Sequence, residues 1–80
     1  MKNRIRKILA AEGKLATDAM NLGDDEDLYS AGLSSFASVQ LMLALEDAFE
    51  VEFSEKMLNR RTFQSIGSIA AALTELKGSA

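Results

Sequence analysis

The chain has 80 residues, 48% of them hydrophobic, and a formal net charge of −3. This length corresponds to one domain, residues 1–80, near the lower limit at which a hydrophobic core suffices without disulfides or a metal. Cysteine, histidine and proline are absent, which excludes disulfides, zinc–thiolate and histidine–metal sites, and nucleophiles activated by histidine. The sequence therefore predicts no metal site. The excess of acidic over basic residues argues against a protein that binds nucleic acid, because such binding depends on basic patches.

The N-terminal residues do not have the pattern of a secretion signal. Lys2, Arg4, Arg6 and Lys7 interrupt the apolar positions, and no small-residue cleavage site follows a long apolar run. Nowhere does an apolar run approach the length needed to span a bilayer. We therefore expect a cytoplasmic protein with no membrane partner.

The first expected helix covers residues 1–12. Its apolar residues Ile5, Ile8 and Leu9 follow helical spacing, and the four basic residues among them are expected to face water. Gly13 is a plausible end for this helix, because glycine is common just after the last helical turn.

A long loop is expected over residues 14–33, where apolar residues are scattered without a sustained period. A loop of this length in a small domain is usually functional or disordered, and its apolar residues indicate that it packs onto the core. The acidic run at residues 24–27 lacks the ligand spacing of a calcium-binding loop, so we interpret it as solvated.

The central element is a helix expected within Gly32–Phe49, with Ser34 or Ser35 as its N-cap. It has two apolar stripes on opposite sides. The core-facing stripe consists of Ser38, Leu41, Met42, Leu45 and Phe49. The second stripe consists of Phe36, Val39 and Leu43, interleaved with Gln40 and Asp47. This second stripe predicts a surface that a partner covers, although a broadly buried helix is the alternative.

The remaining chain predicts one short and one long helix. Residues 50–53 are expected to be an extended connector with Val51 and Phe53 inward, and a short helical turn should follow over residues 54–59. Ser65 should cap a last helix that ends near Lys77, with residues 78–80 as a frayed tail. Its inward residues are expected to be Ile66, Ile69, Ala70, Leu73 and Leu76. The sum is an all-α, four-helix bundle with three longer helices, one short helix and a long first loop.

Several short segments carry a resemblance to a known family. They are Asp27-Leu28, Ala31-Gly32-Leu33, Val39-Gln40-Leu41, Ala44-Leu45-Glu46-Asp47-Ala48-Phe49 and Thr62-Phe63-Gln64-Ser65-Ile66. With these, nearly the whole chain resembles the acyl carrier proteins, small helical bundles that carry 4′-phosphopantetheine on a serine. The family's attachment triplet, aspartate-serine-leucine, falls on Ser34-Ser35-Phe36, so the resemblance implies that Ser35 is the attachment site.

From the residues alone, the site remains open. Ser34 and Ser38 are rivals to Ser35, and a serine at a helix start is most often only a cap. Two departures from the family triplet, Ser34 for aspartate and Phe36 for leucine, favour a specialised acyl, aminoacyl or peptidyl carrier. The alternatives are the housekeeping carrier of fatty-acid synthesis and, from another class, an unmodified helical adaptor that binds a partner helix.

The resemblance implies a protein that is not an enzyme and that holds its cargo as a thioester on the arm, which comes from coenzyme A. Its expected partners are a phosphopantetheinyl transferase, a ligase or synthase that loads the cargo, and downstream transferases. We expect a monomer that docks these enzymes through Phe36, Val39, Gln40, Leu43 and Asp47, with Glu46 and Glu50 adding acidic charge. Of Arg60 and Arg61, one is expected to cap the short helix and the other to be solvated.

Overall fold

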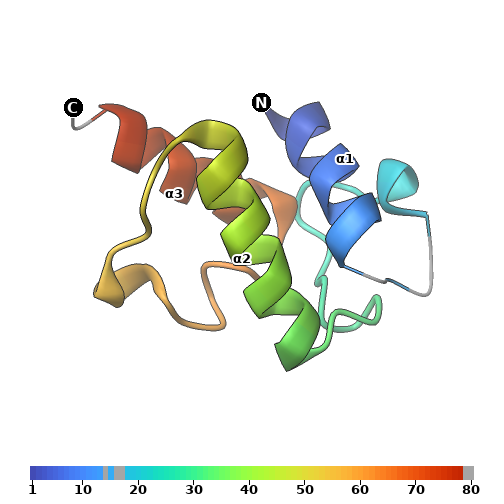
Figure 1. Ribbon diagram of the computed structural model, residues 1–80. Helices are drawn as coiled ribbons and strands as arrows, with labels where there is room; N and C mark the ends of the chain where they lie inside the picture. The colour runs from blue at the N-terminus through green and yellow to red at the C-terminus, as the bar shows by residue number, and fades with distance from the viewer. Residues whose placement is uncertain (14, 16–17, 79–80) are drawn as a thin grey trace.

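The computed structural model describes residues 1–13, 15 and 18–78, and within these the secondary structure is entirely helical. The three α-helices of the described residues are α1 (Lys2–Glu12), α2 (Ser35–Phe49) and α3 (Ile66–Gly78). Two short 3-10 helices, η1 (Ala19–Asn21) and η2 (Glu55–Met57), lie in the connections. In Figure 1, α2 crosses the front of the molecule, with α1 on one side and α3 behind it. The all-α prediction is confirmed.

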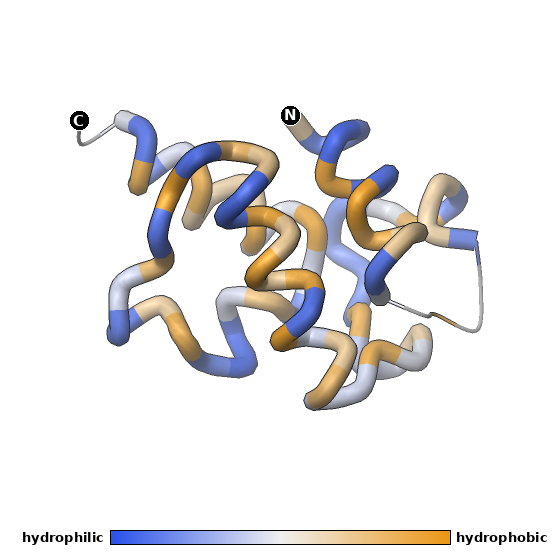
Figure 2. The backbone as a smooth tube through the Cα atoms, viewed as in Figure 1, coloured by the Kyte–Doolittle hydropathy of each residue, from blue (hydrophilic) through white to orange (hydrophobic). Residues whose placement is uncertain are grey.

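The core lies where the three α-helices meet. Its largest fully buried side chains come from every α-helix and from the first loop: Ile5, Leu9, Leu28, Leu41, Leu45, Ile66, Ile69 and Leu73. The residues expected to face inward near the middle of each α-helix are therefore buried, which confirms this prediction. Ser38 and Met42, expected in the core-facing stripe, are only half-buried. Figure 2 shows hydrophobic residues around most of α2, so that burying one side of this helix leaves apolar residues on the other.

The basic residues of α1 do not all face water, and this part of the prediction is wrong. Arg6 is only 14% exposed and donates to the Leu22 carbonyl and to the Asp24 carboxylate. Lys2 pairs with the same carboxylate at 2.9 Å. Hydrogen bonds from Lys2 and then Arg6 hold the pKa of Asp24 below its ordinary value of 3.8. The acidic loop is thus tied to α1 rather than simply solvated.

The first loop packs onto the helices, as its scattered apolar residues predict. The Leu28 N–H donates to the Gln64 carbonyl at 2.7 Å, and the Gly67 N–H donates to the Asp24 carbonyl at 2.8 Å. A side chain at Gly67 would begin 3.2 Å from that carbonyl oxygen, so this close approach explains a glycine in the first turn of α3. The parts of the predicted loop at positions 14, 16 and 17 lie outside the described residues.

The chain leaves α2 through a left-handed residue, Glu50, with φ 55°. The connector that follows is held by the Glu46 carboxylate, which accepts the Phe53 N–H at 2.9 Å. Phe53 is buried, and its ring meets the Phe63 ring edge-on at a centroid distance of 5.3 Å. Glu46 therefore has a structural role, and its expected contribution to attracting partners stays a prediction.

The predicted fourth helix is a 3-10 helix, η2, instead of an α-helix. It spans only Glu55–Met57, has no buried residue, and its N-cap residue Ser54 makes no side-chain cap hydrogen bond. Only Met57 of this segment packs, partly buried, against the core, and without a side-chain cap this is too little to stabilise an α-helix. The last helix begins as predicted, since the Ser65 hydroxyl accepts the Ser68 N–H at 3.1 Å. It extends through Gly78, which was expected in the tail; positions 79 and 80 lie outside the described residues.

Candidate functional site

The start of α2 is built by the turn that precedes it. The Leu33 N–H donates to the Leu28 carbonyl at 3.0 Å, and the chain passes through Gly32 with φ 113°. A residue with a Cβ is strained at this φ, so glycine suits the turn. Ser34 then caps α2, its hydroxyl oxygen accepting the Ala37 N–H at 3.0 Å. Of the two N-cap candidates, Ser34 is the cap, and Ser35 is the first residue of the helix.

The hydroxyl groups of the three neighbouring serines differ in their hydrogen bonds. The Ser34 oxygen is engaged as the cap, and the Ser38 hydroxyl donates to the Ser35 carbonyl at 2.7 Å. Among the described residues, nothing forms a hydrogen bond with the Ser35 hydroxyl, and Ser35 is exposed. The structure thus distinguishes Ser35 from its two rivals as the exposed, unengaged hydroxyl at the helix start.

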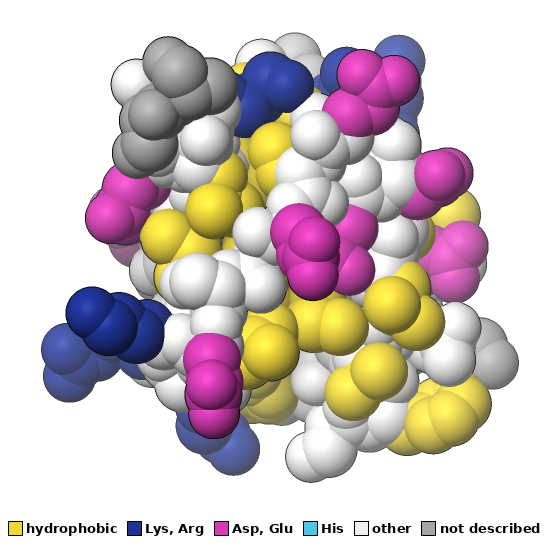
Figure 3. Space-filling view, turned by 60° about the vertical axis from the view of Figure 1, so that its left-hand side comes forward, with side chains coloured by type: hydrophobic (Ala, Val, Ile, Leu, Met, Phe, Trp, Pro, Cys, Tyr) yellow, Lys and Arg dark blue, Asp and Glu magenta, His cyan; other side chains and the backbone are white. Residues whose placement is uncertain are grey.

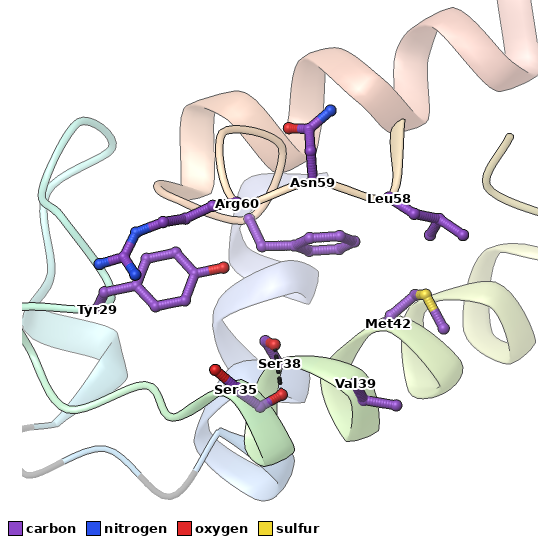
Figure 4. A pocket seen from close by; sticks show the side chains of 9 residues that line it. Tyr29, Ser35, Ser38, Val39, Met42, Leu58, Asn59 and Arg60 are labelled. Atoms are coloured by element: carbon purple, nitrogen blue, oxygen red, sulfur yellow. Dashed lines mark hydrogen bonds between the residues drawn. The ribbon is translucent and has the colours of Figure 1, made fainter. Parts of the chain in front are cut away.

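A groove of about 280 Å³ opens beside Ser35. Figure 4 shows that its floor comes from the first turns of α2 and its opposite wall from the segment after η2, with Tyr29 of the first loop at one end. The lining residues are Tyr29, Ser35, Ser38, Val39, Met42, Leu58, Asn59, Arg60 and Phe63. The groove explains why Ser38 and Met42 are not fully buried.

One end of the groove is formed by an aromatic–cation pair. The Arg60 guanidinium carbon lies 4.1 Å from the centroid of the Tyr29 ring, a distance at which a cation is attracted to the ring face. Arg60 therefore does not cap the short helix, as one of the two arginines was expected to do. Arg61 is exposed. The sequence carried no signal for this contact, which joins residues 31 positions apart.

The second apolar stripe of α2 is exposed. Phe36 is 69% exposed, and Val39 and Leu43 are each 50% exposed; Gln40 and Asp47 on the same side are also exposed. In Figure 3, hydrophobic side chains gather in the lower part of one face, below acidic side chains. The broadly buried alternative for this helix is therefore wrong. We call Phe36, Val39, Gln40, Leu43 and Asp47 the α2 face.

The described residues contain no group of three or more side chains able to hold a metal ion. In the same residues, no helix has the length and apolar content required to cross a membrane. Neither carboxylate nor imidazole lines the groove beside Ser35, so the described groove supplies no general base of its own.

The fold and the site define a class of protein: a small helical domain that displays an unengaged serine at the start of its central helix. Residues 3–73 match the family described as "Phosphopantetheine attachment site". The chain belongs to this family of carrier proteins, whose cofactor is 4′-phosphopantetheine, and the resemblance seen in the sequence is confirmed. The exposed Ser35 hydroxyl and the groove beside it fit the attachment of this group.

Two curated relatives carry cargo of one chemical class. An aminoacyl carrier protein of Agrobacterium fabrum is 55% identical over 69 residues, which cover 86% of this chain and 83% of the relative. A D-alanyl carrier protein of Streptococcus uberis is 31% identical over 72 residues, with 89% of this chain and 91% of the relative covered. Both relatives are thus named as carriers of amino acids.

Solved structures agree with this fold. The chain superposes with a TM-score of 0.90 on a carrier protein from Agrobacterium tumefaciens, crystallised with an engineered Bradyrhizobium japonicum glycine:[carrier protein] ligase and AMP. That match has 51% sequence identity and covers 92% of this chain and 99% of the other. A solution structure of a protein from Agrobacterium tumefaciens matches with a TM-score of 0.77 at 48% identity over the full length of both chains.

Proposed function

We propose that this carrier bears 4′-phosphopantetheine on Ser35 and that its cargo is an amino acid. The observation that carries the choice of Ser35 is its exposed, unengaged hydroxyl between two serines whose hydroxyls are both occupied. The position at the first turn of α2 also favours the negative charge of a phosphodiester, because the positive end of the helix dipole lies there.

An amino acid as cargo is supported by the named relatives. Both curated relatives are carriers of amino acids, which favours the specialised carrier over the carrier of fatty-acid synthesis.

In this account the chain's own residues hold and present the arm but do no catalysis. When bound, the arm supplies a thiol that carries the cargo as a thioester. Attachment would form a bond between the Ser35 oxygen and the pantetheine-bearing phosphorus of coenzyme A, while the phosphoanhydride bond at that phosphorus breaks and 3′,5′-ADP leaves. The hydroxyl proton passes to the phosphopantetheinyl transferase, because the groove residues of the described chain include no carboxylate or imidazole. A cytoplasmic location and a monomeric state remain predictions.

We further propose that the α2 face docks the enzymes that load and unload the arm. Its apolar residues start one position after Ser35, with Phe36 the most exposed at 69%. A partner that covers Phe36 and Leu43 removes apolar surface from water at the place where it must reach the arm. Asp47, exposed at the other end of this face, would attract basic surfaces and raise the association rate more than the affinity. The partner of the Agrobacterium tumefaciens carrier, a glycine:[carrier protein] ligase, indicates the class of loading enzyme.

The test of the cargo is a competition on the phosphopantetheinylated protein. It is incubated with ATP and either a glycine:[carrier protein] ligase with amino acids or an acyl-carrier synthetase with long-chain fatty acids, and intact mass is read. We expect the mass of an amino acid to be added and the fatty acyl group to be transferred poorly. Efficient transfer of the fatty acyl group, with none of the amino acid, would overturn the aminoacyl assignment.

A further inference from the structure

The groove beside Ser35 has an unusual charge for this protein. The chain as a whole is acidic, with a formal net charge of −3, yet the charged side chain that lines the described groove is a cation, Arg60. In the described residues, the ion pairs belong to Lys2 and Arg6, both with Asp24, and no carboxylate pairs with Arg60. A cation without an anionic partner therefore faces the groove that Ser35 also lines.

The contact between Arg60 and Tyr29 holds this cation in place without occupying its donors. The Arg60 guanidinium carbon lies 4.1 Å from the centroid of the Tyr29 ring, so the ring face attracts the cation without accepting a hydrogen bond at a polar atom. The N–H donors of a guanidinium lie in its plane, in a fork that matches the oxygens of a phosphate group. The contact with the ring restricts the long side chain, and among the described residues no hydrogen-bond acceptor occupies the Arg60 donors, which leaves them available to an anion.

We propose that Arg60, held by Tyr29, binds the phosphodiester of the arm attached to Ser35. This assigns a positioning role to the pair. It holds the charged phosphodiester at the end of the groove and so restricts the direction in which the arm leaves Ser35. Figure 4 shows the guanidinium over the Tyr29 ring at the end of the groove where Ser35 also lies. The inference rests on the proposed attachment at Ser35, and its test is arranged so that the two can fail separately.

The test compares apo and phosphopantetheinylated forms of the parent, Arg60→Gln and Arg61→Gln. Arg61 is the matched control, because it is the adjacent, exposed arginine and does not line the groove. Intact mass first establishes that each protein is loaded; an unmodified parent would count against the attachment site and not against Arg60. The readouts are then the change in Tm on loading and the ³¹P chemical shift of the phosphodiester.

We expect loading to raise the Tm of the parent and of Arg61→Gln, and to raise that of Arg60→Gln by less than half as much. The ³¹P resonance of Arg60→Gln should differ from the two others, and salt should reduce the parent's gain because the pair is solvent-exposed. Equal changes in all three loaded proteins would overturn the proposal. If Arg60→Gln does not fold, the parent alone decides: loading should shift the Arg60 Nε–H and Tyr29 ring resonances, and unchanged resonances refute the contact.

Discussion

Replacing Glu50 with glycine is expected to stabilise the protein. Glu50 ends α2 in the left-handed region, with φ 55° and ψ 49°, a conformation that costs a residue with a Cβ about 1–2 kcal/mol. Its carboxylate also lies at the negative end of the helix dipole, which costs about 0.3–1 kcal/mol. The greater freedom of glycine in the unfolded chain reduces this gain in stability by about 0.4–1 kcal/mol. The expected net gain is about 1 kcal/mol, or a rise in Tm of roughly 4–8 °C for a domain of this size.

The control for this prediction is Glu50→Gln, which removes the charge but keeps the strained backbone. Thermal and urea unfolding, followed by circular dichroism at 222 nm, should order the stabilities as glycine variant, glutamine variant, parent. The side chain of Glu50 is exposed, so neither substitution should disturb the core. If Glu50→Gly is no more stable than Glu50→Gln, the reasoning from the left-handed backbone is refuted.

Three further predictions concern the cap, the acidic loop and the α2 face. Ser34→Ala should cost about 1 kcal/mol of stability in urea unfolding through loss of the cap, yet remain a substrate for phosphopantetheinylation; a folded variant that cannot be loaded would contradict this. Because the pKa of Asp24 is lowered in the folded protein, its stabilising contribution is present above its ordinary pKa of 3.8 and is lost as pH falls through the lower folded value. The stability difference between parent and Asp24→Asn should therefore disappear in acid, and a difference that persists would refute the pairing. Phe36→Ala should raise the KM of the loading ligase roughly tenfold, about 1.4 kcal/mol, whereas Met20→Ala, 47% exposed on η1, should leave it unchanged; equal effects would argue against docking on the α2 face.

The helices and the core could be predicted because their signals are local. Helical spacing of apolar residues is enough to assign the buried sides of α1 and α3, and the prediction for Leu41 and Leu45 of α2 holds for the same reason. The roles of Arg4 and Arg6 could not be predicted. Arg4 lies over the Phe49 ring at 4.5 Å, 45 positions away, and such contacts depend on how the helices pack rather than on their own sequence.

The site was predictable only in part. The resemblance pointed to Ser35, but from the residues alone three serines within one helical turn were equivalent candidates. What separates them is which hydroxyl caps the helix and which bonds back to a carbonyl, and these bonds exist only once α2 has formed. The stripe of Phe36, Val39 and Leu43 was visible in the sequence, but its exposure could not be predicted, because it depends on which sides of α2 the other elements cover.

The most direct test of the attachment site is intact mass after incubation with coenzyme A and a broad-specificity phosphopantetheinyl transferase. The set comprises the parent and the alanine variants of Ser34, Ser35 and Ser38, each shown to be folded by circular dichroism. We expect the parent, Ser34→Ala and Ser38→Ala each to gain the mass of one phosphopantetheine and Ser35→Ala to gain none. Modification of Ser35→Ala would move the site to another serine, and a folded parent that stays unmodified would favour an unmodified adaptor over a carrier.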